Sequence, residues 1–194
     1  MDWDFFALTY RQRYITRWGL MRNSERENVA EHSYDVAVLA HALAVISNEV
    51  FSTGCDAERC AALALFHDAS EIFTGDLPTP IKYRSQTLTQ SYKDIERLAA
   101  ERLLSFLPGE MRARYNGLLS PDETTLEYRL VKAADKLSAY IKCVQERRAG
   151  NGDFTSAEKQ TLAALESMAL PEVGYFIEHF IPAFEKTLDE LGKL

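Results

Sequence analysis

Residues 61–80 read AALALFHDASEIFTGDLPTP, a stretch in which an apolar run ends in a cluster of polar groups. His67 and Asp68 follow the apolar run directly, and Glu71 comes three residues after Asp68. In a helix, residues three and four apart lie on the same face, so Glu71 would share a face with both. A buried carboxylate costs several kcal/mol unless it is paired or binds a metal. We therefore expect a cation next to these side chains.

Apolar spacing typical of helices extends from this stretch over almost the whole chain. Asn28 and Glu31 have the spacing of a capping box, and Asp56 is a good N-cap for the helix that contains His67. Gly75 and the prolines after it are expected to end that helix. The expected helices cover 3–14, 29–49, 57–73, 87–107, about 109–117, Pro121 to about Arg148, about 154–169, and 172–192 with a kink at Pro182. Convincing strand alternation is missing, so the sequence predicts an all-α, compact multi-helix fold in a single domain over 1–194.

The composition limits the possible classes of function. Lys and Arg number 22 against 29 Asp and Glu, so the formal net charge is −7 and a nucleic-acid polymer is a poor partner. The sequence contains no apolar run of 18 residues and no apolar signal segment at the start, so we expect neither a membrane span nor export. Three cysteines fit reduced thiols in the cytoplasm. One basic stretch, RQRYITRWGLMRNSER (11–26), holds five arginines that could bind a phosphate or form a solvated, ion-paired face.

Two further residues have the chemistry of metal ligands. His32 falls in the first turn of the helix expected at 29–49, and Asp135 lies on a small, apolar stripe of the long helix that ends near Arg148. With the His67-Asp68 pair they supply two imidazoles and two carboxylates, a set that suits one divalent ion such as Mn²⁺, Co²⁺, Fe²⁺ or Zn²⁺. An ion of this kind activates water for hydrolysis. Taken singly, His32 is more often structural and Asp135 more often ion-paired, so the combination is what favours a metal site.

Four stretches of the chain resemble the bacterial HD-domain 5′-deoxynucleotidases, a branch of the HD-domain metal-dependent phosphohydrolases. The order His32, His67-Asp68, Asp135 in a helical chain is similar to that of the wider superfamily. The closer resemblance is carried by RWGLMRN (17–23), NVAEHS (28–33), HDASEIFTGDLPTPIKY (67–83) and VKAADKLSAYIKC (131–143). It extends from about residue 5 to residue 190, and 67–83 is its most specific part.

The resemblance implies a site for one divalent metal and a nucleotide. The implied metal ligands are His32, His67, Asp68 and Asp135. The implied contacts to substrate come from Arg17, Trp18, His32, Asp68, Asp76, Leu77, Pro78, Thr79 and Asp135. Arg17 would orient the phosphate, in agreement with the fork that a guanidinium offers to phosphate oxygens. Trp18 would pack near the sugar and disfavour a ribose 2′-hydroxyl, although an indole here could equally belong to the core.

The implied reaction is hydrolysis of deoxyribonucleoside 5′-monophosphates to deoxynucleoside and phosphate, by a homodimer. Glu71 would be needed for the chemistry, since it lies one turn past His67 and could take a proton from the attacking water or orient that water. Asp76 would protonate or position the leaving O5′, and its alternative is a simple turn aspartate after Gly75. Thr79 sits in a stiff loop between two prolines, where its hydroxyl and amide could contact phosphate.

Two alternative functions stay open. One is a related hydrolase of nucleoside triphosphates or regulatory nucleotides, which would want more basic residues for three phosphates or more histidines for a second metal. The chain has four histidines, and the two others, at 41 and 179, are expected to be packed or at the surface. The second alternative is a non-catalytic module that senses a nucleotide. A pure binder has no need of the extra acid at Glu71, so hydrolysis of a monophosphate is favoured.

Overall fold

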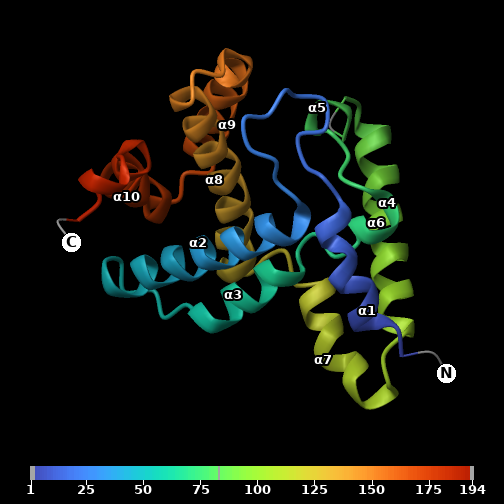
Figure 1. Ribbon diagram of the computed structural model, residues 1–194. Coiled ribbons are helices and arrows are strands. Elements are labelled where there is room, and N and C mark those ends of the chain that lie inside the picture. The colour runs from blue at the N-terminus through green and yellow to red at the C-terminus, as the bar shows by residue number, and fades with distance from the viewer. Residues whose placement is uncertain (1–2, 83, 193–194) are drawn as a thin grey trace.

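The computed structural model describes residues 3–82 and 84–192, with the side chains of residues 79 and 80 outside that description, and it is built from helices (Figure 1). The α-helices are α1 (Phe5–Thr9), α2 (Val29–Glu49), α3 (Ala57–Phe66), α4 (Glu71–Thr74), α5 (Thr79–Lys82), α6 (Gln86–Ser105), α7 (Gly109–Leu119), α8 (Leu126–Arg148), α9 (Thr155–Ser167) and α10 (Pro171–His179). Short 3₁₀ helices cover Tyr10–Tyr14, Gly152–Phe154, Ile181–Glu185 and Leu188–Glu190. Within the described ranges the β-structure is one isolated bridge, between Thr16 and Asn28, so the all-α prediction is confirmed.

The core forms around α2, which packs against α3, α8 and α10. Leu43 of α2 and Leu137 of α8 are fully buried in this main cluster. A second, smaller cluster joins α1 to α6 through Phe5 and Leu103. Ala69, from the segment between α3 and α4, is buried in the second cluster, so His67 and Asp68 are held where the two clusters meet.

The start of α2 is as predicted. The Asn28 side chain accepts from the amides of Ala30 and Glu31, and the Glu31 carboxylate accepts from the Asn28 amide, which completes the capping box. By length and composition α2 could also cross a membrane, but it is the central core helix, which passes the same test. The cap fixes the first turn of α2, where His32 lies.

The prediction of one helix over 57–73 is wrong at its C-terminal end, because α3 ends at Phe66. Bonds of the i→i−3 type then run from the amides of His67, Ala69 and Glu71, so the chain tightens into a turn before α4 begins. The ring of His67 contributes to the break: its Nδ1 lies 2.7 Å from the Ala64 carbonyl and caps the end of α3. Asp56 does cap α3, through the amide of Arg59, and Gly75 ends α4 with a φ of 69°.

Three other predicted helices differ from the structure. The first, expected over 3–14, is α-helical over Phe5–Thr9 and continues as a 3₁₀ helix over Tyr10–Tyr14. The long helix begins at Leu126 with Thr125 as its N-cap, not at Pro121, because Asp122 holds a turn through the amide and hydroxyl of Thr124. The last predicted helix, 172–192, is broken after His179 rather than kinked, and 3₁₀ turns follow. Pro182 lacks the amide hydrogen that a continuing helix needs.

Candidate metal centre

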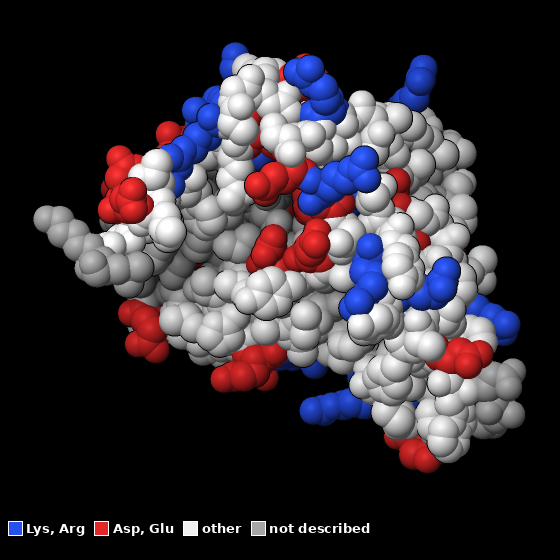
Figure 2. All heavy atoms as spheres, in the orientation of Figure 1, with Lys and Arg blue, Asp and Glu red and all other residues white. Residues whose placement is uncertain are grey.

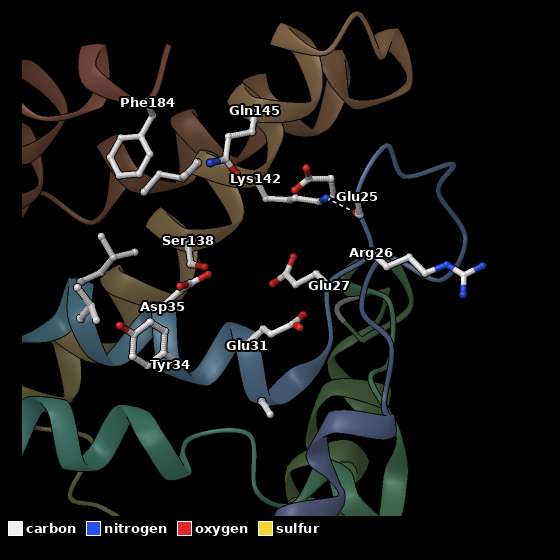
Figure 3. A pocket seen from close by; sticks show the side chains of 14 residues that line it. Glu25, Arg26, Glu27, Glu31, Tyr34, Asp35, Ser138, Lys142, Gln145 and Phe184 are labelled. Carbon is white, nitrogen blue, oxygen red and sulfur yellow. Dashed lines mark hydrogen bonds between the residues drawn. The ribbon is translucent and has the colours of Figure 1, made fainter. Parts of the chain in front are cut away.

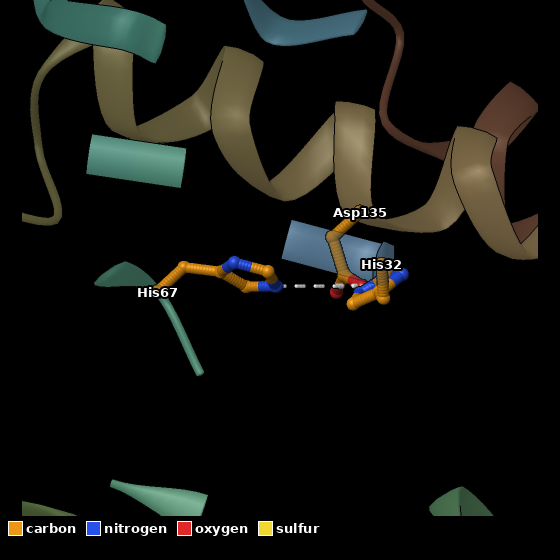
Figure 4. A group of neighbouring side chains, drawn as sticks. All are labelled: His32, His67 and Asp135. Carbon is orange, nitrogen blue, oxygen red and sulfur yellow. Dashed lines mark hydrogen bonds and ion pairs between the residues drawn. The ribbon is translucent and has the colours of Figure 1, made fainter. Parts of the chain in front are cut away.

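Three separate segments bring together the predicted metal ligands. His32 comes from α2, Asp135 from α8, and His67 and Asp68 from the turn between α3 and α4. One ligand atom each from His32, His67 and Asp135 lie within 4.8 Å of one another, a group that could hold a metal ion (Figure 4). Asp135 Oδ1 is 3.1 Å from His32 Nε2 and 3.9 Å from His67 Nε2. The packing of α2 against both α3 and α8 produces this convergence.

Asp68, the fourth predicted ligand, lies next to this group. Its Oδ2 lies 3.1 Å from His67 Nε2 and 3.6 Å from His32 Nε2. Burial raises the pKa of Asp68, but the neighbouring His67 and His32 outweigh it and lower the pKa well below the usual value. Burial likewise raises the pKa of Asp135, but the bond to His32 and the charge of Lys132 outweigh burial, so this pKa also lies well below the usual value. Both carboxylates are therefore ionised and face the same point as the two imidazoles.

The environment of His67 tests whether these residues fit a metal. Its Nδ1 must carry the proton, because it can only donate to the Ala64 carbonyl 2.7 Å away. In the neutral ring Nε2 is then a lone pair; this buried atom lies 3.1 Å from Asp68 Oδ2 but makes no hydrogen bond of good geometry. A buried lone pair aimed at two carboxylates has a natural partner in a cation. The donor set therefore fits a divalent ion.

His32 is also held through its Nδ1, but its Nε2 is hydrogen-bonded to Asp135 Oδ1 at 3.1 Å. It is fully buried, and its Nδ1 lies 3.2 Å from Glu27 Oε1 and 3.3 Å from Ser138 Oγ. A carboxylate can only accept, so Nδ1 carries a proton and Nε2 faces the metal ligands. Burial and the Arg17 charge lower the pKa of His32, but its bonds to Asp135 and Glu27 raise the pKa to about 9. The cluster thus attracts positive charge strongly.

The loop before α2 places Arg17 and Trp18 beside the metal ligands. Arg17 Nη1 lies 3.4 Å from Asp68 Oδ2, and its Nε lies 3.2 Å from Glu27 Oε1. Burial lowers the pKa of Arg17, but the carboxylates around it outweigh burial and raise it, so the guanidinium stays charged. Trp18 donates from Nε1 to Glu27 Oε2 at 2.9 Å and packs on Phe154, with ring centroids 5.3 Å apart. Its φ of 55° is a conformation that costs about 1–3 kcal/mol outside glycine.

Glu27 is the central residue of this arrangement that the sequence analysis missed. It contacts His32, Arg17 and Trp18 at once. A glutamate just before an N-cap has no distinctive spacing to any of these partners. The one available signal was its position between two stretches, RWGLMRN and NVAEHS, that were already associated with the site.

Glu71 and Asp76 follow the turn that contains His67 and Asp68. Glu71 is the first residue of α4, and Asp76 comes after α4 ends. Glu71 is 6% exposed, and its Oε2 is buried without a partner. Burial, followed by the charges of Asp68 and Asp76, raises the pKa of Glu71 to about 9. Burial also raises the pKa of Asp76, partly offset by the Arg17 charge. Both acids therefore belong to the electrostatic environment of the metal ligands.

The segment after Asp76 is only partly described. Leu77 and Pro78 are half-buried and lead into α5, which begins at Thr79. The side chain of Thr79 lies outside the described residues, so its contact to phosphate stays a prediction. The same holds for the contacts of Leu77 and Pro78 to a nucleotide.

A cavity of about 770 Å³ is lined by residues of the loop before α2, of α2 and of α8, among them Glu27 and Ser138 (Figure 3). Acidic side chains of Glu27, Glu31 and Asp35 point toward one another at its mouth. Figure 2 shows acidic groups gathered around a hollow in the middle of this face, with Lys and Arg side chains beside them. None of the residues predicted to line the nucleotide site lines this cavity, although Glu27 and Ser138, which contact His32, do.

Comparison with known proteins identifies the family. Residues 4–184 match the family described as 5′-deoxynucleotidase YfbR-like. The chain belongs to the YfbR-like family. A YfbR-like relative, a 5′-deoxynucleotidase of Shewanella oneidensis, is 48% identical over 190 residues, which cover 97% of each chain. The 5′-deoxynucleotidase YfbR of Escherichia coli is 46% identical over 97% of this chain and 96% of the relative.

Solved structures extend the likeness of this YfbR-like chain to other HD-domain proteins. An HD-domain phosphohydrolase from Listeria innocua superimposes with a TM-score of 0.81 at 26% identity, covering 93% of this chain and 88% of the other. An HD phosphohydrolase of cyanophage S-2L, described as bound to dA and one catalytic Zn²⁺ ion, gives a TM-score of 0.65 at 19% identity, with 91% and 96% covered. The second likeness is one of fold. The family match and the 48% identical relative confirm the predicted resemblance to HD-domain 5′-deoxynucleotidases.

Proposed function

We propose that this chain is a metal-dependent phosphomonoesterase that hydrolyses deoxyribonucleoside 5′-monophosphates to deoxynucleoside and inorganic phosphate. The observation that carries the proposal is the buried, unpartnered Nε2 of His67, which faces Asp68, Asp135 and His32 in a chain of the YfbR-like family. The curated relatives that share 46–48% identity over nearly the full chain are named 5′-deoxynucleotidases. A site of this composition and a family of this activity point to the same chemistry.

His32, His67, Asp68 and Asp135 would hold one divalent ion, of the Mn²⁺, Co²⁺, Fe²⁺ or Zn²⁺ class. The ion, when bound, lowers the pKa of water and polarises a phosphoryl oxygen. The protein keeps both imidazoles in the tautomer that offers Nε2 as ligand, through the Ala64 carbonyl on one side and Glu27 on the other.

Arg17 is placed to bind the substrate phosphate. Its Nη1 now faces Asp68, so a phosphate that bridges the metal ligands and the guanidinium would take up this donor. Trp18, fixed next to Arg17 by Glu27 and Phe154, would pack against the sugar and leave no room for a 2′-hydroxyl.

Glu71 would move the proton of the attacking water. Its raised pKa depends on burial and on the negative charges of Asp68 and Asp76, so a cation beside Asp68 would bring it down toward neutrality. A carboxyl with a pKa near the working pH is well suited to accept and return a proton. Asp76 would position or protonate the leaving O5′.

A phosphate-release assay tests this function. Purified protein would be incubated with dAMP, AMP or dATP, with Mn²⁺ or Co²⁺ and with excess chelator. We expect inorganic phosphate from dAMP, much less from AMP, and none after the metal is removed. Pyrophosphate or triphosphate release from dATP would instead support a triphosphohydrolase. Nucleotide binding with no turnover of any substrate would support a sensor.

We further propose that residues 1–194 act as one HD-type domain, in the cytoplasm and away from membranes, and that two copies associate. The three buried free thiols suit a reducing compartment. Association is supported by an apolar stripe on α6, where Leu88, Ile95 and Leu98 are exposed at helical spacing.

A further inference from the structure

We propose that Glu27 is a positioning residue that orients the metal-binding, phosphate-binding and sugar-facing groups through one carboxylate. The roles of Glu27 at the phosphate-binding Arg17 and the sugar-facing Trp18 rest on the proposed deoxynucleotidase function. Its role in orienting His32 depends only on metal binding.

The geometry divides the two oxygens of Glu27 among three partners. Oε1 lies 3.2 Å from His32 Nδ1 and 3.2 Å from Arg17 Nε. Oε2 accepts the Trp18 indole N–H at 2.9 Å. The side chain is 13% exposed, and burial raises its pKa while the bond to His32 and the Arg17 charge lower it to below the ordinary value. Glu27 is therefore a nearly dry, ionised carboxylate that accepts a hydrogen bond from Trp18 and lies at ion-pair distance from His32 and Arg17.

The backbone around Glu27 fixes the direction of its side chain. The Arg17 amide donates to the Glu27 carbonyl at 3.0 Å, and the Val29 amide donates to Ile15 at 3.0 Å, so the two ends of the loop form a short antiparallel pair. Asn28, the next residue, is locked as the N-cap of α2. Glu27 is held by a bridge on one side and a helix cap on the other.

Each of the three side-chain contacts of Glu27 has a separate consequence. The contact at His32 Nδ1 directs Nε2 toward Asp135, where a bound cation would take the place of the Nε2 proton. The contact at Arg17 Nε sets the plane of the guanidinium, whose Nη1 side faces Asp68 and would receive the phosphate. The bond at Trp18 Nε1 holds an indole whose backbone has a φ of 55°, a conformation that needs support from its surroundings. Loss of Glu27 should therefore affect three measurable properties.

The test compares Glu27→Gln with Glu25→Gln. Gln has one acceptor oxygen and an NH₂ group, so it must place a donor against His32 and Arg17 or against Trp18. Glu25 lies in the same loop, is exposed, and loses the same charge on substitution. Co²⁺ affinity would be measured by titration calorimetry of metal-free protein, and kcat/KM would be measured on dAMP and AMP. For Glu27→Gln we expect Co²⁺ affinity to fall roughly 10- to 100-fold and the dAMP preference over AMP to fall at least tenfold, with Glu25→Gln near wild type.

A second variant separates the effects and guards against misfolding. Trp18→Phe removes the indole N–H donor together with the five-membered ring but leaves Glu27 in place, so the dAMP preference should fall while Co²⁺ affinity stays within about twofold. Circular dichroism and thermal unfolding check that each variant is folded, and if Glu27→Gln is not, Glu27→Asp replaces it. Glu27→Asp keeps the charge but not the reach, and the same losses are expected. Folded Glu27 variants with wild-type Co²⁺ affinity and sugar preference would overturn the proposal. Absence of turnover in the wild type would refute the proposed function, while the calorimetry would still decide the role of Glu27 at His32.

Discussion

The two ring nitrogens of His67 have opposite environments, and this asymmetry explains why a histidine ends a helix here. Nδ1 donates a hydrogen bond to the Ala64 carbonyl, and this bond both caps α3 and fixes the tautomer of the ring. Nε2 is left buried toward the carboxylates. The sequence analysis found this residue because a polar group after an apolar run is conspicuous. It could not find Glu27, whose three partners become neighbours only after the loop closes on α2.

Glu71 supports a prediction about the balance of activity and stability. In Glu71→Gln we expect kcat on dAMP to fall roughly 100- to 10,000-fold, because a proton-transfer group is lost, while dAMP and Co²⁺ affinities stay within a few-fold. The pKa of Glu71 is raised from 4.5 to about 9 in the folded protein, so the wild type loses stability as the pH rises from 4.5 toward 9. Glutamine does not ionise, so the variant should unfold at a higher temperature than the wild type at pH 8 without metal. Steady-state kinetics, calorimetry and thermal unfolding measure these effects.

The matched control for this prediction is Glu178→Gln, which removes an exposed acid from α10. It should leave both kcat and the unfolding temperature unchanged. A Glu71→Gln variant with near-wild-type kcat would show that Glu71 transfers no proton.

At the scale of elements, local signals predicted the starts of helices better than their ends. The capping box at Asn28 and the cap at Asp56 involve residues three apart, so the sequence contains all the information they need. The end of α3 depends on the ring of His67 turning back to a carbonyl, and the end of α10 is followed by 3₁₀ turns around Pro182. Periodicity alone continues through both breaks, which is why the predicted helices were too long.

The loop that contains Arg17 and Trp18 is anchored to α8 by a buried acid. Glu146, 2% exposed, accepts from the Ser24 amide at 2.9 Å and from Asn151 Nδ2 at 2.8 Å, and it pairs with Lys142. Asn151 also donates to the Arg22 carbonyl. Burial raises the pKa of Glu146, but the bonds from Lys142, Ser24 and Asn151 outweigh it and lower the pKa to about 2.

This anchor predicts a specific acid sensitivity. Because the folded pKa of Glu146 is below the unfolded value of 4.5, its contribution is complete above pH 4.5 and is lost as pH falls toward about 2. Urea unfolding should show that the wild type loses about 1 kcal/mol more than Glu146→Gln between pH 6 and pH 3.5. At pH 6 the variant should be less stable by about 1–3 kcal/mol, since buried charge-assisted bonds are weakened. Equal pH dependence in the two proteins would show that the anchor is not ionic.

At the scale of the whole molecule, the α3–α4 turn connects two apolar clusters, with Ala64 of α3 in the main cluster and Ala69 of the turn in the smaller one. The main cluster fixes α2, α3 and α8, while Ala69 ties the turn to the smaller cluster of α1 and α6. The all-α class follows from periodicity and is confirmed, and the ligands proposed from residue type lie close together in the structure. The sequence could not predict which cluster each helix joins, since that depends on contacts between segments far apart in the chain.

The apolar stripe of α6 leads to a prediction about assembly. Ile95 and Leu98 are 48% and 55% exposed, so their substitution by glutamate should leave the fold intact. If two copies meet here, sedimentation velocity should show a dimer for the wild type and a monomer for Ile95→Glu/Leu98→Glu, with the same melting temperature within a few degrees at low protein concentration. Val45→Glu, on an exposed position of α2, is the control. A wild-type monomer, or a double variant that remains dimeric, would rule out this interface.

The distance along the chain between the metal ligands has a consequence for folding kinetics. His32 and Asp135 are separated by 103 residues, and Arg17 and Asp68 by 51, so no short fragment contains the centre. Contacts of such long range form only after the intervening loops have closed. Cation uptake should therefore be among the last steps of refolding, slower than the appearance of helical signal in circular dichroism. The d–d absorption of Co²⁺ added during refolding would follow completion of the native topology and not collapse of the chain.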